Sequence, residues 1–183
     1  NLNDKGQFVL RCYGSRTEVF LYLSTLYKVQ QVFSYQESGC KRTWDKDKAV
    51  AAFFKELGIQ WKEFARDGIK RGIKNRKGWD KHWYTVMSSP IPRYSIRNST
   101  LVKLDHPFEL PADLENELKD YPPVFQPAGE QKAWSYLNSF VEGRGFKYSF
   151  LISKPTESRK SCGRISPYLT YGNITIRQVY QFV

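Results

Sequence analysis

Hydrophobic and polar positions change between strand and helix patterns over the first part of the chain. Residues 7–13 are rich in β-forming side chains and predict a strand. Ser15 and Glu18 have the spacing of a capping box, which predicts a helix start. Residues 29–35 predict a second strand. The helix between these strands carries apolar residues at helical spacing: Val19, Leu23 and Leu26.

A second helix and a third strand continue this pattern. Thr43 is expected to cap the helix, and Gly58 to end it in the left-handed conformation. Its apolar stripe consists of Ala49, Val50, Phe53, Phe54 and Leu57. Residues 59–64 predict a buried strand. The order strand, helix, strand, helix, strand predicts parallel strands with right-handed crossovers. Because no glycine-rich dinucleotide fingerprint follows these strands, we expect no NAD site.

A proline-rich segment divides the chain. Before it, a short helix opens at residue 78, with Trp79 and Trp83 one turn apart. This pair indicates core packing more than an electron relay. Prolines recur from residue 88 to residue 126, where a brief helix over 111–119 is expected. We interpret residues 89–126 as an interdomain connector.

Helices dominate the expected structure after the connector. Residues 128–142 predict an amphipathic helix. A loop is expected from residue 148 to 155, followed by a basic stretch at 159–160. Ser166 and Thr175 are each expected to start a further helix as its N-cap.

The run at positions 161–169 carries the most informative chemistry. Ser166 is a good N-cap, and Pro167 fits the first helical position. The start of a helix leaves N–H groups unpaired and carries the positive end of the dipole, which suits a phosphate. Gly163 allows close backbone approach, and Arg164 adds a charge for a phosphate or an internal carboxylate. From these residues alone, an ordinary capped helix on a basic surface is the favoured interpretation.

Composition limits the classes of protein. At 183 residues, with 40% hydrophobic content, the chain can build one large domain or two modest ones. Charges interrupt every apolar run, so we expect no membrane span. Cys12, Cys40 and Cys162 are widely separated, which is typical of an intracellular protein rather than a disulfide framework or zinc site. His82 and His106 have no clustered ligands in the sequence. We therefore expect no metal site and a cytoplasmic location.

The formal net charge is +11 at pH 7. Such an excess attracts polyanions, of which nucleic acid is the usual one. A solvated surface is nevertheless the more common meaning of a charge run, so a basic nucleic-acid-binding α/β module remains an alternative function. Much of the charge falls on eight residues: Lys62, Arg66, Lys70, Arg71, Lys74, Arg76, Lys77 and Lys81.

Several motifs occur in a fixed order between residues 125 and 179. They are the Gly129-Glu130 helix entry, Arg144, Tyr148, Pro155, Ser166-Pro167-Tyr168-Leu169, Gly172, Ile176 and Arg177. This order resembles the opening of the flavin-binding domain of the photolyase and cryptochrome family. Residues 35–39, 43–45 and 66–69 resemble the second half of the α/β domain that precedes it in that family.

The resemblance implies an α/β fold in two parts. A Rossmann-like parallel-sheet part, incomplete here, is expected over residues 1–88 as the antenna domain. The connector is expected over 89–126, and the first helices of an all-α FAD-binding domain over 127–183. In this family the antenna domain often holds a folate or a deazaflavin, and Glu37 lies where some members place a folate-contacting glutamate. Most of the flavin pocket is expected after the last residue, so this chain alone is expected to bind FAD weakly and to be inactive.

FAD is the cofactor that the resemblance implies. Tyr148 is expected to contact the flavin nucleotide, and the segment 162–166 to bind its pyrophosphate. Many relatives have threonine and serine in place of Cys162 and Gly163, and arginine in place of Ile152, which indicates a divergent branch. No catalytic residue is expected within the chain. The expected binding residues are Tyr148, Cys162, Gly163, Arg164, Ile165 and Ser166.

The implied activity is that of a deoxyribodipyrimidine photolyase, a carbon–carbon lyase. In this family light excites reduced FAD, which transfers an electron to a cyclobutane or (6-4) pyrimidine lesion in DNA. UV-damaged DNA is therefore the expected partner, and we expect a monomer that does not associate with membranes. A cryptochrome-type blue-light sensor with the same fold and no repair activity is the alternative within the family.

Overall fold

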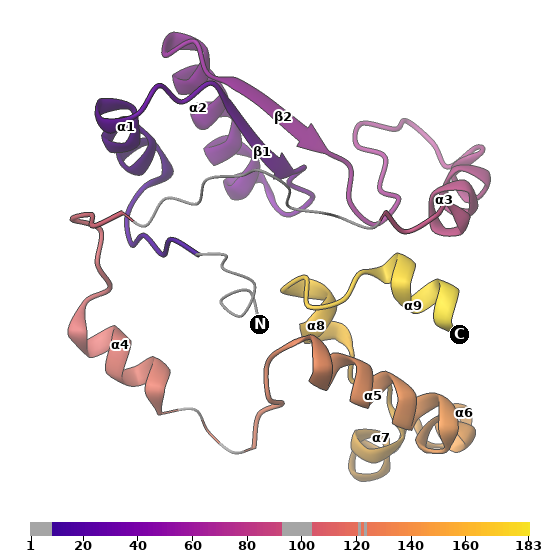
Figure 1. Cartoon of the computed structure of the whole chain (residues 1–183). Helices are drawn as coiled ribbons and strands as arrows, with labels where there is room; N and C mark the ends of the chain where they lie inside the picture. The colour runs from indigo at the N-terminus through magenta and orange to yellow at the C-terminus, as the bar shows by residue number, and fades with distance from the viewer. Residues whose placement is uncertain (1–8, 93–103, 121, 123) are drawn as a thin grey trace. The chain divides into compact units, whose positions relative to one another are not determined.

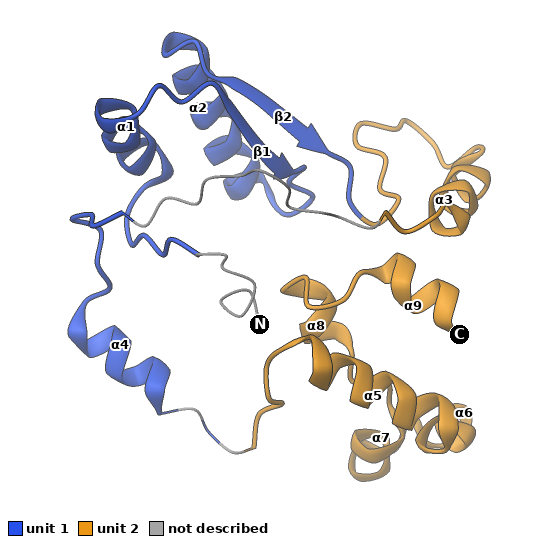
Figure 2. Cartoon of the chain, viewed as in Figure 1, with its two compact units in different colours: residues 1–66, 93–122 blue, residues 67–92, 123–183 orange. Residues whose placement is uncertain are grey.

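The computed structural model describes residues 9–92, 104–120, 122 and 124–183 (Figure 1). The chain divides into two compact units (Figure 2). Unit 1 comprises residues 1–66 and 93–122, and unit 2 comprises residues 67–92 and 123–183. The expected boundary after residue 88 therefore differs from the division at Arg66. The middle of the expected connector, residues 93–103, lies outside the described residues.

Unit 1 is a mixed α/β structure, which confirms this part of the expected fold class. Its two strands run parallel, with Gln31 paired to Gln60 and Tyr35 paired to Phe64. The predicted parallel pairing of the second and third strands is therefore correct. The elements of unit 1 are α1 (Arg16–Leu26), β1 (Gln31–Tyr35), α2 (Lys41–Glu56), β2 (Gln60–Phe64) and α4 (Ala112–Lys119).

The core of unit 1 forms between α2 and the sheet. Val50, Phe54 and Ile59 are buried, and Phe54 is only 2% exposed. The rings of Phe20 and Trp61 meet Phe54 edge-on, with centroids 4.8 and 5.6 Å away. The middle of the apolar stripe predicted for α2 therefore packs in this core, whereas Ala49 and Leu57, also predicted for the stripe, are exposed.

Two of the predicted helix-end signals in unit 1 are confirmed, and one is wrong. Ser15 and Glu18 form the predicted capping box, and hydrogen bonds from Ser15 lower the pKa of Glu18. Gly58 has the predicted positive φ, 67°. The prediction that Thr43 caps α2 is wrong, because the helix begins at Lys41. The Thr43 hydroxyl donates instead to the carbonyl oxygen of Cys40, 2.8 Å away.

The strand predicted at residues 7–13 is not formed over its described part. Residues 9–13 have no regular secondary structure and belong to no ladder. Tyr13 N–H donates to the carbonyl oxygen of Phe108 at 2.9 Å, and one such bond does not make a strand pair. A β-rich composition fixes a strand only where a partner strand lies alongside. Residues 7 and 8 lie outside the described residues.

The regular secondary structure of unit 2 is helical over its described residues, and loops join the helices. Its core contains Ala133, Leu137, Tyr168, Ile174 and Val179, and the Tyr168 hydroxyl donates to Pro127 O at 2.8 Å. The elements are α3 (Trp79–Ser88), α5 (Glu130–Glu142), the 3₁₀ turn η2 (Arg144–Lys147), α6 (Tyr148–Leu151), α7 (Pro155–Ser161), α8 (Ser166–Thr170) and α9 (Ile176–Phe182).

Two short helices replace the loop expected at residues 148–155 and the basic stretch after it. These are α6 and α7. The sequence does contain residues that favour the start and the end of α7, but the whole helix has only seven residues. Pro155 stands at the first position and Glu157 in the first turn, while Arg159 and Lys160 lie in the last turn. Each residue type is favourable at that end of a helix.

α3 and α9 pack together through aromatic rings and side-chain hydrogen bonds. The Trp83 and Tyr180 rings meet edge-on at 5.2 Å, and Trp79 stacks on Trp83 at 6.3 Å. The amide of Gln181 donates to the carbonyl oxygens of Met87 and Ser89, at 2.7 and 2.8 Å. These contacts explain why α3 belongs to unit 2. No helix within the described residues has the length and apolar character needed to cross a membrane.

Candidate functional site

The segment with the expected pyrophosphate-binding residues joins the end of α7 to α8. Ser166 is not the N-cap of α8, as the sequence predicted, but its first residue, and Pro167 follows as the second. Ile165 takes the N-cap position with φ −92° and ψ −8°, so the helical geometry begins before the serine. Since the isoleucine side chain has no acceptor atom, α8 begins without a side-chain cap of its own.

The start of α8 has one amide donor fewer than an ordinary helix start. Pro167 has no N–H group, and Leu169 N–H donates to Ile165 O at 3.0 Å. A helix start normally leaves four N–H groups unpaired. The hydroxyl of Ser161 is also engaged, because it donates to Glu157 O at 3.2 Å inside α7. The charged group that this segment can offer to an anion is the guanidinium of Arg164.

Arg164 is held from two sides. Its backbone has φ 57°, in the left-handed region, and its carbonyl oxygen accepts a hydrogen bond of 2.7 Å from the Gln126 amide. Its guanidinium carbon lies 5.7 Å from the centre of the Tyr136 ring, within the range of a cation–π contact. The side chain predicted to meet a phosphate or a carboxylate is thus positioned over an aromatic ring of α5.

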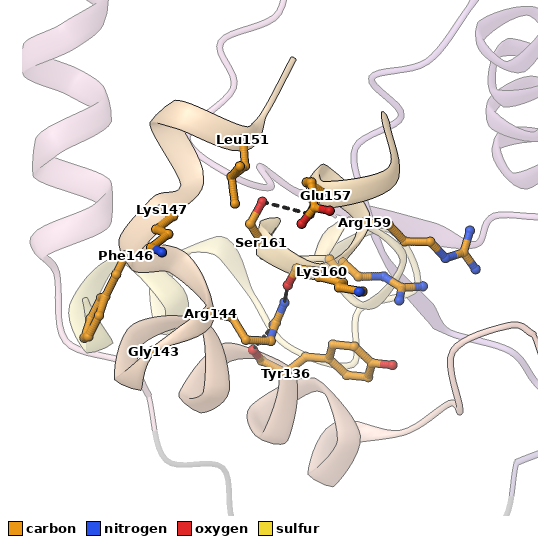
Figure 3. Close-up of a pocket in the computed structure, with 11 residues that line it drawn as sticks. Tyr136, Gly143, Arg144, Phe146, Lys147, Leu151, Glu157, Arg159, Lys160 and Ser161 are labelled. Carbon is orange, nitrogen blue, oxygen red and sulfur yellow. Dashed lines mark hydrogen bonds between the residues drawn. The ribbon is translucent and has the colours of Figure 1, made fainter. Parts of the chain in front are cut away.

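Arg144 ties the end of α5 to the segment between α7 and α8. Its Nε donates to Ser139 Oγ at 3.0 Å, and one Nη donates to Tyr136 O at 2.9 Å. The other Nη donates to Lys160 O at 3.0 Å and Cys162 O at 2.6 Å. Figure 3 shows the Arg144 side chain reaching from Tyr136 towards Lys160. The fork of five N–H donors in a guanidinium makes such a four-way contact possible.

A pocket of about 630 Å³ opens beside this arginine, within unit 2 (Figure 3). We call it the cationic pocket because, among the described residues, its lining has five basic side chains and one carboxylate. Its volume falls in the usual range for small-molecule sites. The lining residues are Tyr136, Gly143, Arg144, Phe146, Lys147, Leu151, Glu157, Arg159, Lys160, Ser161 and Arg164.

Of the six expected binding residues, Arg164 lines the cationic pocket. Cys162 lies at the end of α7, where its N–H donates to Ser158 O at 2.9 Å. Tyr148 and Gly163 both lie close to the ring of Phe140. The Tyr148 ring meets Phe140 edge-on at 5.9 Å, and a Cβ atom on Gly163 would lie 3.9 Å from Phe140. Ile165 packs on the core of unit 2, and Ser166 is exposed.

Sequence reasoning missed most of the charged residues of the cationic pocket. Arg159 and Lys160 were predicted only as a basic stretch, and no prediction was made for Lys147. The signal that places Arg159 and Lys160 beside Arg164 is the helical spacing of α7, which was interpreted as loop. Arg144 was noted as a motif residue, but its four hydrogen bonds depend on contacts that only the fold creates.

The donor set of the cationic pocket fits the diphosphate of a dinucleotide. Guanidinium and ammonium groups bind phosphate oxygens by charge-assisted hydrogen bonds. Lys147, Lys160 and Arg164 lie in the lining beside the apolar surface of Phe146 and Leu151. A flavin dinucleotide combines an anionic diphosphate with an aromatic ring system, and both kinds of surface are present here. The backbone of Gly163 contributes no tight cradle, since its added Cβ would make only ordinary contacts.

A second hollow, of about 290 Å³, lies in unit 1 between β1 and α2, and Glu37 lines it. A Glu37 carboxylate oxygen accepts a hydrogen bond of 2.6 Å from Gly39 N–H. Arg16 and Asp47, also in the lining, form an ion pair of 2.6 Å. The described lining of this hollow therefore has one cation and two carboxylates, and both carboxylates have partners within the protein. The antenna chromophore at Glu37 stays a prediction.

The described cysteines and histidines do not form a metal site. Across residues 9–92, 104–120, 122 and 124–183, no three metal-ligating side chains gather. Burial raises the pKa of Cys12, whose sulfur lies 3.9 Å from His106 Nε2. Hydrogen bonds from the Thr43 and Arg42 backbone lower the pKa of the exposed Cys40. Neither thiol belongs to the cationic pocket.

The chain was also compared with known proteins. A scan against models of protein families finds no match, and a search of curated proteins finds no significant similarity.

Proposed function

We propose that the chain is part of a light-driven DNA repair flavoprotein of the deoxyribodipyrimidine photolyase type. The observation that carries the proposal is the excess of positive charge in the cationic pocket. The pocket includes Arg164 of the expected pyrophosphate-binding run and the motif residue Arg144, and its other cations lie between these two positions in the sequence. The Rossmann-like interpretation of unit 1, with its parallel β1 and β2, belongs to the same proposal.

The residues of unit 2 have distinct roles in this proposal. Lys160 and Arg164 bind the diphosphate of FAD, and Lys147 adds positive charge nearby. Arg144 keeps the end of α7 and the residue after it in position through its bonds to Lys160 O and Cys162 O. When bound, reduced FAD supplies the light-driven electron transfer that splits a pyrimidine dimer. The protein orients the cofactor and excludes water.

Repair is tested with the protein at its full natural length, loaded with reduced FAD. The substrate is a short DNA duplex with a single cyclobutane thymine dimer inside a restriction site. Blue light should restore cleavage at that site, whereas an identical sample kept dark should not. Replacing Lys160 with alanine and Arg164 with glycine should slow repair at limiting FAD, because each lost charge-assisted contact weakens binding by ~1.5–3 kcal/mol.

Two outcomes contradict the repair function. Retained flavin without repair of cyclobutane or (6-4) lesions points to a light sensor of the cryptochrome type. Failure to retain flavin at all removes the proposed function altogether.

A further inference from the structure

The loop that leads into α3 is exposed and strongly basic. Residues 69–78, called here the basic loop, are exposed at every position and belong to unit 2. The loop contains no acidic residue. Its large apolar side chains are Ile69 and Ile73, which are exposed as well. Five of its ten residues carry a positive charge: Lys70, Arg71, Lys74, Arg76 and Lys77.

Both ends of the basic loop are fixed on α3. Before the loop, Gly68 is buried with φ 69°, and a Cβ there would lie 3.0 Å from the Trp83 ring and 3.3 Å from Met87. A larger residue would therefore separate the loop from α3. At the other end, Gly78 forms the N-cap of α3 with φ 69°, and its carbonyl oxygen accepts from His82 N–H at 3.3 Å.

The interior of the basic loop is also ordered by local contacts. Gly72 turns the chain with φ 72°. The Asn75 side chain accepts a hydrogen bond of 3.0 Å from Lys77 N–H, which forms a side-chain-stabilised turn. The Arg76 guanidinium lies 5.1 Å from the centre of the Trp79 ring, while remaining exposed. The cations are therefore presented on a preformed loop, which lowers the entropy cost of binding.

Within the described part of the chain, no carboxylate forms an ion pair with a lysine of this loop. Lysines elsewhere do pair: Lys41 lies 2.6 Å from Asp45, and Lys119 lies 3.8 Å from Glu115. Among the ion pairs between described residues, none involves Lys70, Lys74 or Lys77. These three lysines lie within eight residues and repel one another, and a polyanion relieves this repulsion.

Duplex DNA is the polyanion that best matches these features. Its phosphates provide about one negative charge per 1.7 Å along the axis, so several cations of one short loop meet phosphates together. A membrane surface would instead favour an amphipathic helix with a wide apolar face. The basic loop has no helix and two separate isoleucines.

We propose that the basic loop binds the phosphate backbone of duplex DNA without sequence selectivity. The loop forms a contact surface separate from the cationic pocket. This binding does not rest on the flavin, because loop residues and pocket residues are different and each set can be changed alone.

The test measures binding of an undamaged 20-base-pair duplex, a length chosen for the experiment at about two helical turns, by fluorescence anisotropy at several salt concentrations. The variant carries Lys70→Ala, Lys74→Ala and Lys77→Ala, three exposed lysines. Each phosphate contact contributes about 0.9 to the slope of log K against log salt concentration. We expect the slope of the variant to be shallower by about three and its affinity at low salt to be lower.

The matched control carries Lys28→Ala, Lys46→Ala and Lys55→Ala, which are exposed lysines of unit 1 and remove the same charge. Circular dichroism confirms that both triple variants are folded. The control should retain the slope of the unchanged protein. An equal loss in the control would overturn the proposal, since net charge alone would then explain binding. The proposal would also be overturned if the unchanged protein bound no duplex but bound vesicles containing phosphatidylserine, and if the loop variant lost this vesicle binding.

Discussion

Arg164 occupies a backbone conformation that most side chains avoid. A residue other than glycine in the left-handed region costs roughly 1–2 kcal/mol, because its Cβ crowds the backbone. The hydrogen bond from Gln126 to Arg164 O and the contact with the Tyr136 ring offset this cost. These two contacts therefore hold the strained backbone and keep the guanidinium in one orientation at the edge of the cationic pocket.

Two substitutions at this position separate backbone strain from charge. Arg164→Ala and Arg164→Gly remove the same cation, but glycine tolerates φ 57° and alanine does not. We expect the glycine variant to be more stable than the alanine variant by about 1 kcal/mol. Urea unfolding measures this as a difference in midpoint at equal slope. A glycine variant less stable than the alanine variant would show that the left-handed conformation is not maintained.

Residue-scale signals were predictable from sequence where they are local. The Ser15 box and the Thr175 cap depend on side chains within three residues of the helix start, and both are present. The conformation of Arg164 was not predictable, because positive φ is normally signalled by glycine or asparagine. It depends on Gln126, which lies far away in the sequence.

Arg144 acts at the scale of elements, because its four hydrogen bonds connect α5 to the segment after α7. Lysine carries the same charge but presents its donors from one point, so it cannot reach both sides at once. The carbonyl oxygens of Tyr136 and Cys162 are part-buried at these bonds. Losing their donor therefore leaves polar atoms with little access to water.

Arg144→Lys should destabilise unit 2 by about 2–3 kcal/mol, the usual loss for hydrogen bonds from a charged donor. The free energy of unfolding in urea measures this loss. Arg159→Lys is the control, because Arg159 lines the same pocket and is exposed. It should change stability by less than about 0.5 kcal/mol. Equal stability of the two variants would mean that Arg144 does not connect these elements.

Long periodic elements were predictable from sequence, and short ones were not. The helices α2 and α5 are amphipathic over several turns, so their cores could be recognised from spacing. α6 and α7 have four and seven residues, too few for a periodic apolar stripe. As a result, the cationic pocket could not be assembled from sequence, although its individual cations could be seen.

At the scale of the whole molecule, contacts between distant residues decide the division into units. α3 joins unit 2 through the contact of Trp83 with Tyr180 and through the hydrogen bonds from Gln181 to the end of α3. In each case the two residues are more than ninety positions apart in the sequence. A sequence pattern reports neighbours along the chain and therefore placed α3 with the strands that precede it. The same limit applies to the strand predicted at 7–13, which needed a partner to pair with.

The central claim is that the cationic pocket binds the diphosphate of a flavin dinucleotide, and equilibrium dialysis of FAD against riboflavin tests it most directly. Riboflavin has the same ring system and no phosphate. The 183-residue chain should prefer FAD by tenfold or more, equivalent to ~1.4 kcal/mol, even though its binding is expected to be weak. The combined variant Lys160→Ala and Arg164→Gly should bind the two flavins equally. Equal affinity in the unchanged chain, or a preference that survives in this variant, would contradict the account.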